Sequence, residues 1–408
     1  MKMLQINVKI GSGSVGTIAR DLYEGITQSG NECRFAFSRG TERDIPLQDT
    51  IRIGNRLDTA DHLIKTRLFG STATYSKGAT RAFLKQVDEY KPDIIHIHGL
   101  YGYYINMELL FDYIRENGIA LVSTLHSCWD YTGHCCYFDY AQCDKWKEDC
   151  RHCPQIKSYP ASLFFDRTSE NLQRKSDYYH SIEHVVLISP SAWMNQLVDQ
   201  SLLKDIPHEV IRNGIDLSVF HKTEDNSYYK SLGLNNGKAT ILSVASIWDR
   251  RKGYEDLLEF AEYAQQFNVN VVAVGLSEEQ MKSKPESLIG IRRTENVSQL
   301  IELYSNAAIL FNPTHEDNYP TVNLESICCQ TPVITYHTGG SPEALQNGTY
   351  GSVIETKDFD TLITVAKKVH SGEMQFCFDD LSSFSKEQMV KKYLSVYNDL
   401  FSRKSSTC

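Results

Sequence analysis

Short apolar runs alternate along the chain with longer stretches in which apolar residues recur every three or four positions. The first repeat of this pattern reads as a strand (MLQINVKI), a glycine-rich break (GSGSVG) and a helix whose Ile18, Leu22 and Ile26 share one face. Further strands are predicted for DIIHIHG, ALVSTLH and HVVLIS, and helices near 77–90 and 104–117. Strands alternating with helices favour a parallel, doubly wound α/β sheet.

A polar stretch, HKTEDNSYYKSLGLNNGK, interrupts the pattern before it resumes with the strand ATILSVAS. Because 408 residues are too many for one ordinary core, we predict two βα domains, residues 1–216 and 217–384. A final helix in 385–408 is expected to pack back on the first domain. Ligands of open α/β sheets bind at the carboxyl ends of the strands, so the expected active site is a cleft between the two domains.

The composition narrows the class of protein. Hydrophobic residues make up 41% and charged residues 23%, which is typical of a globular chain. The net charge of -9 argues against a nucleic-acid binder. The N-terminus does not resemble a signal peptide, and no run of about 18 apolar residues occurs. We therefore expect a cytoplasmic protein, whose eleven cysteines are mostly reduced or bound to metal.

The glycine-rich break matches the G-x-G-x-x-G pattern through Gly11, Gly13 and Gly16. A dinucleotide-binding oxidoreductase would carry an acid at the end of the next strand, but that end reads FAFSRG, and Glu32 stands at its start. Two interpretations remain open. The loop is either a tight turn or a place where a ligand approaches a helix N-terminus.

Histidines and cations also follow predicted strands. His98 and His126 stand at strand ends, where each is either a structural residue or part of a site. The cluster Arg250, Arg251 and Lys252 lies between a strand and a helix. Such a cluster is either a solvated face or a site for a diphosphate, to which the helix N-terminus adds positive charge.

The segment HEDNYPTVNLE follows the strand AILFNP and contains Asp317 and Glu325, eight residues apart. Carboxylates in such a turn can accept hydrogen bonds from sugar hydroxyls. The alternative is helix capping, because an acid in the first turn favours the helix dipole.

Taken together, RRKG, HEDNYPTVNLESICCQTPVI and HTGGSPE, with HIHG, TLHSCW and VIRNGID before them, resemble the retaining glycosyltransferases of family 4. The resemblance covers nearly the whole chain and is strongest to bacterial enzymes that build capsule, colanic-acid-like or other exopolysaccharides. It implies the GT-B fold, in which two Rossmann-like, doubly wound domains face each other across a cleft. The first domain would bind the acceptor and the second the nucleotide sugar.

The resemblance also implies residue roles. His126, Asp317 and Lys252 would be catalytic: His126 and Asp317 would contact the transferred sugar, and Lys252 the diphosphate. Glu325 would hold the ribose of the donor, for which a UDP-sugar is favoured. The implied donor-binding residues are Gly13, Arg251, Lys252, Asn318, Tyr319, Pro320, Thr321 and Glu325.

The sequence departs from the family pattern at two places. Asp317 stands where glutamate is usual. Ser246 and Ile247 stand in the region of a family arginine, which Arg250 or, preferably, Arg251 would replace. Since these cations can neutralise the leaving diphosphate, the resemblance implies front-face attack and no metal cofactor for catalysis. Base specificity is expected near residues 290–296.

A cysteine-rich insert, about 127–160, follows the strand that ends at His126. Cys135, Cys143, Cys150 and Cys153 could form a structural zinc site, with reduced thiols and disulfides as alternatives. The insert would then shape the acceptor pocket.

Residues 51–87 carry seven basic and two acidic groups, a local excess of +5 by subtraction. This stretch is either a solvated face or a patch for lipid-diphosphate acceptors at the inner membrane leaflet. The expected partners are a nucleotide-sugar donor and a lipid-linked oligosaccharide, without nucleic acid. Alternatives are a GT-B enzyme with a small-molecule acceptor, or a catalytically weak, zinc-stapled interaction protein.

Overall fold

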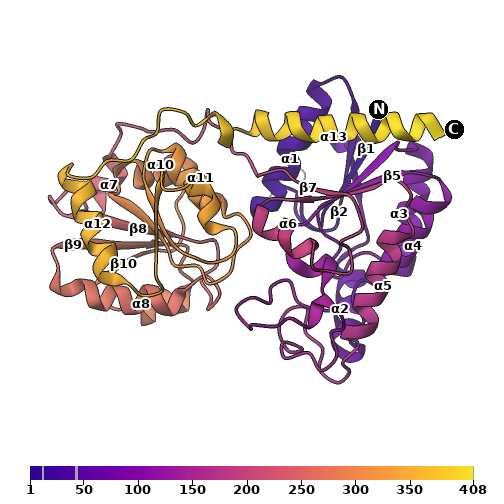
Figure 1. The fold of residues 1–408 in the computed structure, drawn as a ribbon, viewed down its shortest axis with the longest axis horizontal. Helices are drawn as coiled ribbons and strands as arrows, with labels where there is room; N and C mark the ends of the chain where they lie inside the picture. The colour runs from indigo at the N-terminus through magenta and orange to yellow at the C-terminus, as the bar shows by residue number, and fades with distance from the viewer. Residues whose placement is uncertain (12, 42–44, 408) are drawn as a thin grey trace. The chain divides into compact units, whose positions relative to one another are not determined.

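The computed structural model describes residues 1–407 except residue 12 and residues 42–44, and it describes the side chains up to residue 404. Residue 12 of the glycine loop and residue 408 of the final segment therefore lie outside the described part. The chain divides into two compact domains, residues 1–212 with 389–408, and residues 213–388 (Figure 1). The first junction follows residue 212, against 216 in the sequence prediction, and the second follows residue 388, against 384.

The N-terminal domain is built on a parallel sheet with the strand order β3-β2-β1-β4-β5-β6-β7 within the described residues. Its strands are β1 (Lys2–Ile6), β2 (Glu32–Phe37), β3 (Thr50–Arg52), β4 (Ile94–Ile97), β5 (Ala120–Thr124), β6 (Val185–Ser189) and β7 (His208–Val210). Its helices are α1 (Gly13–Gln28), α2 (Arg56–Phe69), α3 (Lys77–Tyr90), α4 (Met107–Glu116), α5 (Thr168–His180) and α6 (Ala192–Val198).

Apolar clusters cover both faces of this sheet, as a parallel sheet requires. Along β1, Leu4 belongs to one cluster and Met3 to the other, because successive side chains point to opposite faces. The last helix, α13 (Lys386–Thr407), contributes Tyr393 and Tyr397 to the cluster that contains Met3. The C-terminal end of the chain therefore closes the N-terminal core.

The C-terminal domain repeats this plan with the strand order β10-β9-β8-β11-β12-β13 in the described part of the chain. Its strands are β8 (Ala239–Val244), β9 (Val269–Val274), β10 (Leu288–Ile291), β11 (Ile309–Asn312), β12 (Val333–Tyr336) and β13 (Gly351–Ile354). Its helices are α7 (Ser227–Ser231), α8 (Tyr254–Tyr263), α9 (Glu278–Ser283), α10 (Val297–Asn306), α11 (Thr321–Cys328) and α12 (Phe359–Ser371).

In each sheet the strand order reverses direction beside the first strand, between β1 and β4 and between β8 and β11. Ligands of doubly wound sheets bind at the carboxyl ends of the strands at such a switch point. The loops after β1, β4, β8 and β11 are thus the places to look for a site. Among the helices of residues 1–11, 13–41 and 45–407, none is long and apolar enough to cross a membrane.

Candidate active site

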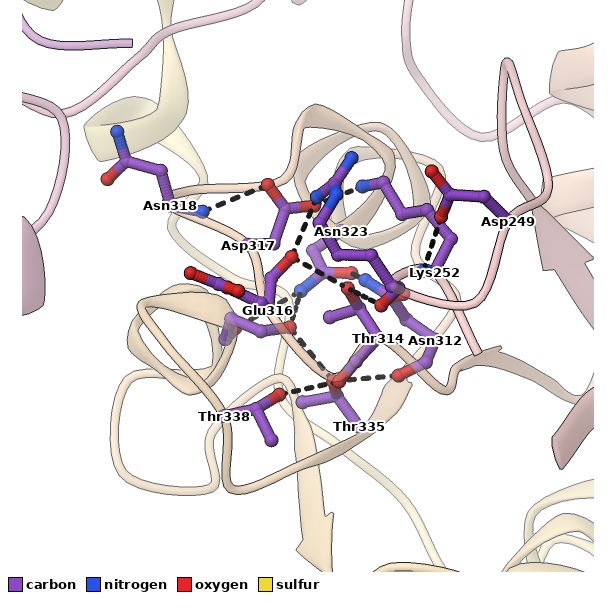
Figure 2. Close-up of polar contacts among 12 residues, drawn as sticks. Asp249, Lys252, Asn312, Thr314, Glu316, Asp317, Asn318, Asn323, Thr335 and Thr338 are labelled. Atoms are coloured by element: carbon purple, nitrogen blue, oxygen red, sulfur yellow. Dashed lines mark hydrogen bonds and ion pairs between the residues drawn. The ribbon is translucent and has the colours of Figure 1, made fainter. Parts of the chain in front are cut away.

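In the C-terminal domain, the loop after β8 and the loop after β11 are joined by hydrogen bonds (Figure 2). The backbone N–H of His315 donates to the carbonyl of Arg251 over 2.8 Å, and the Arg251 guanidinium donates to the carbonyl of Glu316 over 2.7 Å. The close approach needs a glycine at position 253, where φ is +75° and a Cβ atom would lie 2.0 Å from the carbonyl oxygen of Pro313. These contacts fix the backbone around the predicted cations.

The ammonium of Lys252 forms an ion pair with the carboxylate of Asp317, which joins residues 65 positions apart in sequence. Both side chains are largely buried, with 21% and 11% of their surfaces exposed. Burial alone would raise the pKa of Asp317, but the charges of Lys252 and Arg251 outweigh it and hold that pKa below its usual range. Asp317 is therefore ionised at neutral pH.

The backbone amide of Asn318 is one of the predicted donor contacts. In the structure it donates to Oδ1 of Asp317 over 2.9 Å, as Figure 2 shows. Tyr319 and Pro320 follow as buried residues, and Thr321 begins α11. The turn after Asp317 thus leads directly into a helix N-terminus, which attracts anions.

Glu325 lies within α11 and is not part of the Lys252–Asp317 pair. Its Oε2 accepts a hydrogen bond from the hydroxyl of Tyr304, on α10, over 2.9 Å. Burial raises the pKa of Glu325, and the hydrogen bonds from Tyr304 and Thr321 counteract only part of that effect. The structure therefore gives the two acids different partners and different electrostatic surroundings.

A surface hollow, open to solvent, lies where β8, β9 and β10 end. It is lined by Ser246, Ile247, Trp248, Gly275, Leu276, Ser277, Gln280 and Arg292. The sequence had pointed to 290–296 for base specificity, and Arg292 is the one member of that range on the wall. Ser246 and Ile247 had been singled out only as the place of a family arginine, and no signal in the sequence marked Trp248 or the residues after β9.

In the N-terminal domain, buried histidines line the ends of β4 and β5. His98 and His126 join through Nδ1 and Nε2 over 3.1 Å, and Nε2 of His98 lies 2.8 Å from Oε1 of Gln5. Burial, the largest cause, lowers the pKa of His126 to about 3 and holds that of His98 well below its usual value. Both rings are therefore neutral at pH 7.

This chain of hydrogen bonds sets the tautomer of each ring. The amide oxygen of Gln5 can only accept, so Nε2 of His98 carries the proton and its Nδ1 is the acceptor. His126 must then donate from Nε2, which leaves its Nδ1 as an acceptor. The histidine that sequence resemblance marks is thus held in a defined orientation and protonation state.

The remaining predicted residues are placed as follows. Gly13 is the first residue of α1, after β1, and a side chain built there would meet nothing within 4 Å. Arg251 is held by Glu316, as described above. The structure therefore brings Arg251, Lys252 and Asp317 together in one domain, whereas Gly13 and His126 belong to the other domain.

The cysteine insert encloses a narrow space among its side chains. Cys135, Cys143, Cys150 and Cys153 all lie on its wall, so the structure does bring the predicted zinc ligands together. Among the described residues, however, no group of three or more His, Cys, Asp or Glu is arranged to hold a metal ion as it stands. The zinc site therefore stays a prediction.

Known proteins share this sequence pattern and architecture. A family model described as Glycosyltransferase Family 4 matches residues 15–219, half of the chain, and one described as Glycosyl transferases group 1 matches residues 225–377. The chain belongs to glycosyltransferase family 4. This family 4 chain is 24% identical to the putative colanic acid biosynthesis glycosyl transferase WcaC of Escherichia coli K12, over 98% of its own length and 100% of the relative's.

Solved structures give the fold of this family 4 glycosyltransferase. Sucrose-phosphate synthase from Thermosynechococcus elongatus superimposes with a TM-score of 0.72 at 16% identity, covering 98% of this chain and 99% of that one. Anabaena Alr3699/HepE in complex with UDP has a TM-score of 0.64 at 13% identity, covering 98% and 100%. With its two parallel-sheet α/β domains, the chain has the GT-B fold, as the sequence predicted.

Proposed function

We propose that this glycosyltransferase moves a sugar, with retention of configuration, from a nucleotide-diphosphate sugar to a hydroxyl of a lipid-linked surface-polysaccharide oligosaccharide. The observation that carries the proposal is the ion pair of Lys252 and Asp317 at the switch point of the C-terminal sheet. The relative named for colanic acid biosynthesis supports the polysaccharide pathway, and the neighbour solved with UDP supports a UDP-sugar.

The donor would occupy the C-terminal domain. The base enters the hollow lined by Trp248 and Arg292, and Glu325 accepts hydrogen bonds from the ribose hydroxyls. The diphosphate lies against Lys252, Arg251 and the N-terminus of α11, where positive charge is concentrated. Donor binding would therefore draw Lys252 away from Asp317.

We assign the contacts with the transferred sugar to Asp317 of the C-terminal domain and to His126 of the N-terminal domain, and a contact with the donor phosphates to Gly13. Asp317, released from Lys252, accepts a hydrogen bond from a sugar hydroxyl, and Nδ1 of His126 accepts another. The hydroxyl oxygen of the acceptor attacks the anomeric carbon as the bond to the phosphate oxygen breaks. The proton of that hydroxyl passes to the departing phosphate, whose charge Lys252 and Arg251 stabilise without a catalytic metal.

A panel of UDP-, GDP- and TDP-sugars tests this proposal, with sugar release and transfer to purified lipid-linked oligosaccharide as readouts. We expect transfer from one UDP-sugar in the presence of EDTA, and a product with the anomeric configuration of the donor. Glu325→Ala and Lys252→Met should each abolish most of that transfer, whereas Val297→Ser, on an exposed residue of the same domain, should not. Full activity in both site variants would contradict the proposal.

A second candidate is transfer to a small-molecule acceptor. Its support is a relative named D-inositol 3-phosphate glycosyltransferase, 24% identical over 46% of this chain. The relative named for colanic acid biosynthesis matches 98% of the chain, acceptor domain included, which favours the polysaccharide acceptor. Transfer to free inositol phosphate, with none to lipid-linked oligosaccharide, would establish the second candidate.

A further inference from the structure

Helix α2 combines buried polar residues with exposed large apolar ones. Its buried residues are polar: His62 and Thr66 are each 1% exposed. Leu57, Ile64 and Phe69 instead are exposed to 81%, 56% and 46%. Since exposing large apolar side chains to water is unfavourable, this face indicates contact with something other than water.

A second segment continues the apolar surface. Leu163, Phe164 and Phe165, which follow the cysteine insert, are 60%, 72% and 51% exposed. The backbone N–H of Leu163 donates to the carbonyl of Arg67 at the end of α2 over 2.7 Å. The rings of Phe69 and Phe165 stack with their centroids 6.4 Å apart. These two contacts place the segments side by side, at the end of the N-terminal domain where Figure 1 labels α2.

Exposed apolar side chains are concentrated in these two segments. Among the described residues, twelve large hydrophobic side chains are exposed. Six of them belong to these two segments: Leu57, Ile64, Phe69, Leu163, Phe164 and Phe165. We call these six residues the apolar rim.

Basic residues stand among the members of the apolar rim. Arg56 and Arg67 are exposed on α2, and the ammonium of Lys65 forms an exposed ion pair with Asp61 over 2.7 Å. Within α2 the charged residues are Arg56, Lys65 and Arg67 against Asp58 and Asp61, a local excess of +1 by subtraction in a chain of net charge -9. A cationic surface with protruding aromatic and aliphatic side chains is complementary to an anionic lipid bilayer.

We propose that the apolar rim inserts into the headgroup region of an anionic membrane while Arg56 and Arg67 contact lipid phosphates. Phe164 and Leu163, in the loop before α5, would enter deepest, and the exposed side chains of α2 would lie along the interface. Membrane binding would bring the enzyme to a lipid-linked acceptor held in the same membrane, and this role rests on the proposed function. Vesicle binding itself requires neither donor nor acceptor.

The test is cosedimentation of the full chain with vesicles of pure phosphatidylcholine and of phosphatidylcholine mixed with phosphatidylglycerol. We expect binding to the mixed vesicles that weakens as salt is added. Leu163→Ser/Phe164→Ser should lower the partition coefficient by about tenfold or more, because binding scales with buried apolar area. Arg56→Gln/Arg67→Gln should lower it by about thirtyfold at low salt. Leu47→Ser, at a residue 74% exposed outside the rim, is the matched control and should bind like wild type.

Two results would overturn the proposal. One is equal binding of wild type and both double variants to the mixed vesicles, or no binding by any of them. The other is a dimer that dissociates in the Leu163→Ser/Phe164→Ser variant, which would make the rim a contact between copies of this chain. Transfer to a detergent-solubilised acceptor should remain unchanged in the Leu163→Ser/Phe164→Ser variant. A chain that binds vesicles but transfers no sugar would refute the proposed function alone.

Discussion

Replacing one partner of the Lys252–Asp317 ion pair at a time should separate a phosphate-binding role from a sugar-binding role. Lys252→Met removes a charge-assisted hydrogen bond to the diphosphate, which is worth about 1.5–3 kcal/mol. We therefore expect the Kd of UDP to rise by roughly 10- to 150-fold at pH 7. Asp317→Asn instead frees Lys252 from its partner. If the pair contributes about 1 kcal/mol, UDP should bind roughly fivefold more tightly.

The two variants should also differ in transfer. Asp317→Asn replaces a charged acceptor for the sugar hydroxyl with a neutral amide, so kcat should fall by about tenfold or more although UDP binds more tightly. Isothermal titration with UDP and a steady-state transfer assay measure the two effects. If Asp317→Asn weakens UDP binding as much as Lys252→Met does, Asp317 belongs to the phosphate site and the assigned roles are wrong.

The free energy of unfolding shows separately how these substitutions affect the folded state. Lys252→Met leaves a buried carboxylate without its cation, so the free energy of unfolding at pH 7 should fall by about 3 kcal/mol. The depressed pKa of Asp317 stabilises the wild type above the pKa of the unfolded chain, and that contribution is lost as pH falls through the folded pKa. The loss caused by Lys252→Met should therefore shrink in acid, and Lys252→Met/Asp317→Asn should recover part of it at pH 7. Urea denaturation of the wild type, Lys252→Met and the double variant, at pH 7 and at acid pH, measures these free energies of unfolding.

Three further predictions concern other residues. Glu325→Gln should reduce the preference for UDP over its dideoxyribose analogue by about tenfold, because a buried amide accepts a hydrogen bond more weakly than a carboxylate. Titration with both ligands gives the ratio of their Kd values, and an unchanged ratio would remove Glu325 from the ribose site. Burial lowers the pKa values of His96, in β4, and of His126 to about 3. As pH is lowered from 7 to 5, the unfolded chain binds protons at these residues and the folded chain does not, so each should reduce the free energy of unfolding by about 2 kcal/mol. Urea denaturation should show stability decreasing as pH is lowered over this range, and a flat profile would contradict buried neutral rings. Metal analysis of the purified protein should find about one equivalent of zinc. The zinc should be lost in Cys150→Ser/Cys153→Ser and retained in Cys377→Ser, which changes an exposed cysteine outside the insert. Less than about half an equivalent in the wild type would count against the site.

The sequence predicted the repeating βα pattern because the strands of a parallel sheet are buried on both faces and form continuous apolar runs. It did not predict α2, whose exposed Leu57 and Ile64 and buried His62 do not form a core-facing stripe. The sequence of α2 thus lacks the apolar periodicity by which the core-covering helices were predicted. Only the burial of each side chain identifies the rim.

Strand order explains why the sequence motifs could be recognised although most contacts within the site could not be predicted. Lys252 and Asp317 follow β8 and β11, which are neighbours in the sheet although other strands separate them in sequence. A sequence can show that each residue follows a strand, but not that these two strands are adjacent. The hydrogen bond from Tyr304 to Glu325 depends on the contact of α10 with α11, and the wall formed by Ser246 and Arg292 depends on the strand order β10-β9-β8. The doubly wound order is therefore the step that converts separate polar residues into one site, and a change that shifts the register of β11 against β8 should disable the site while leaving each motif intact.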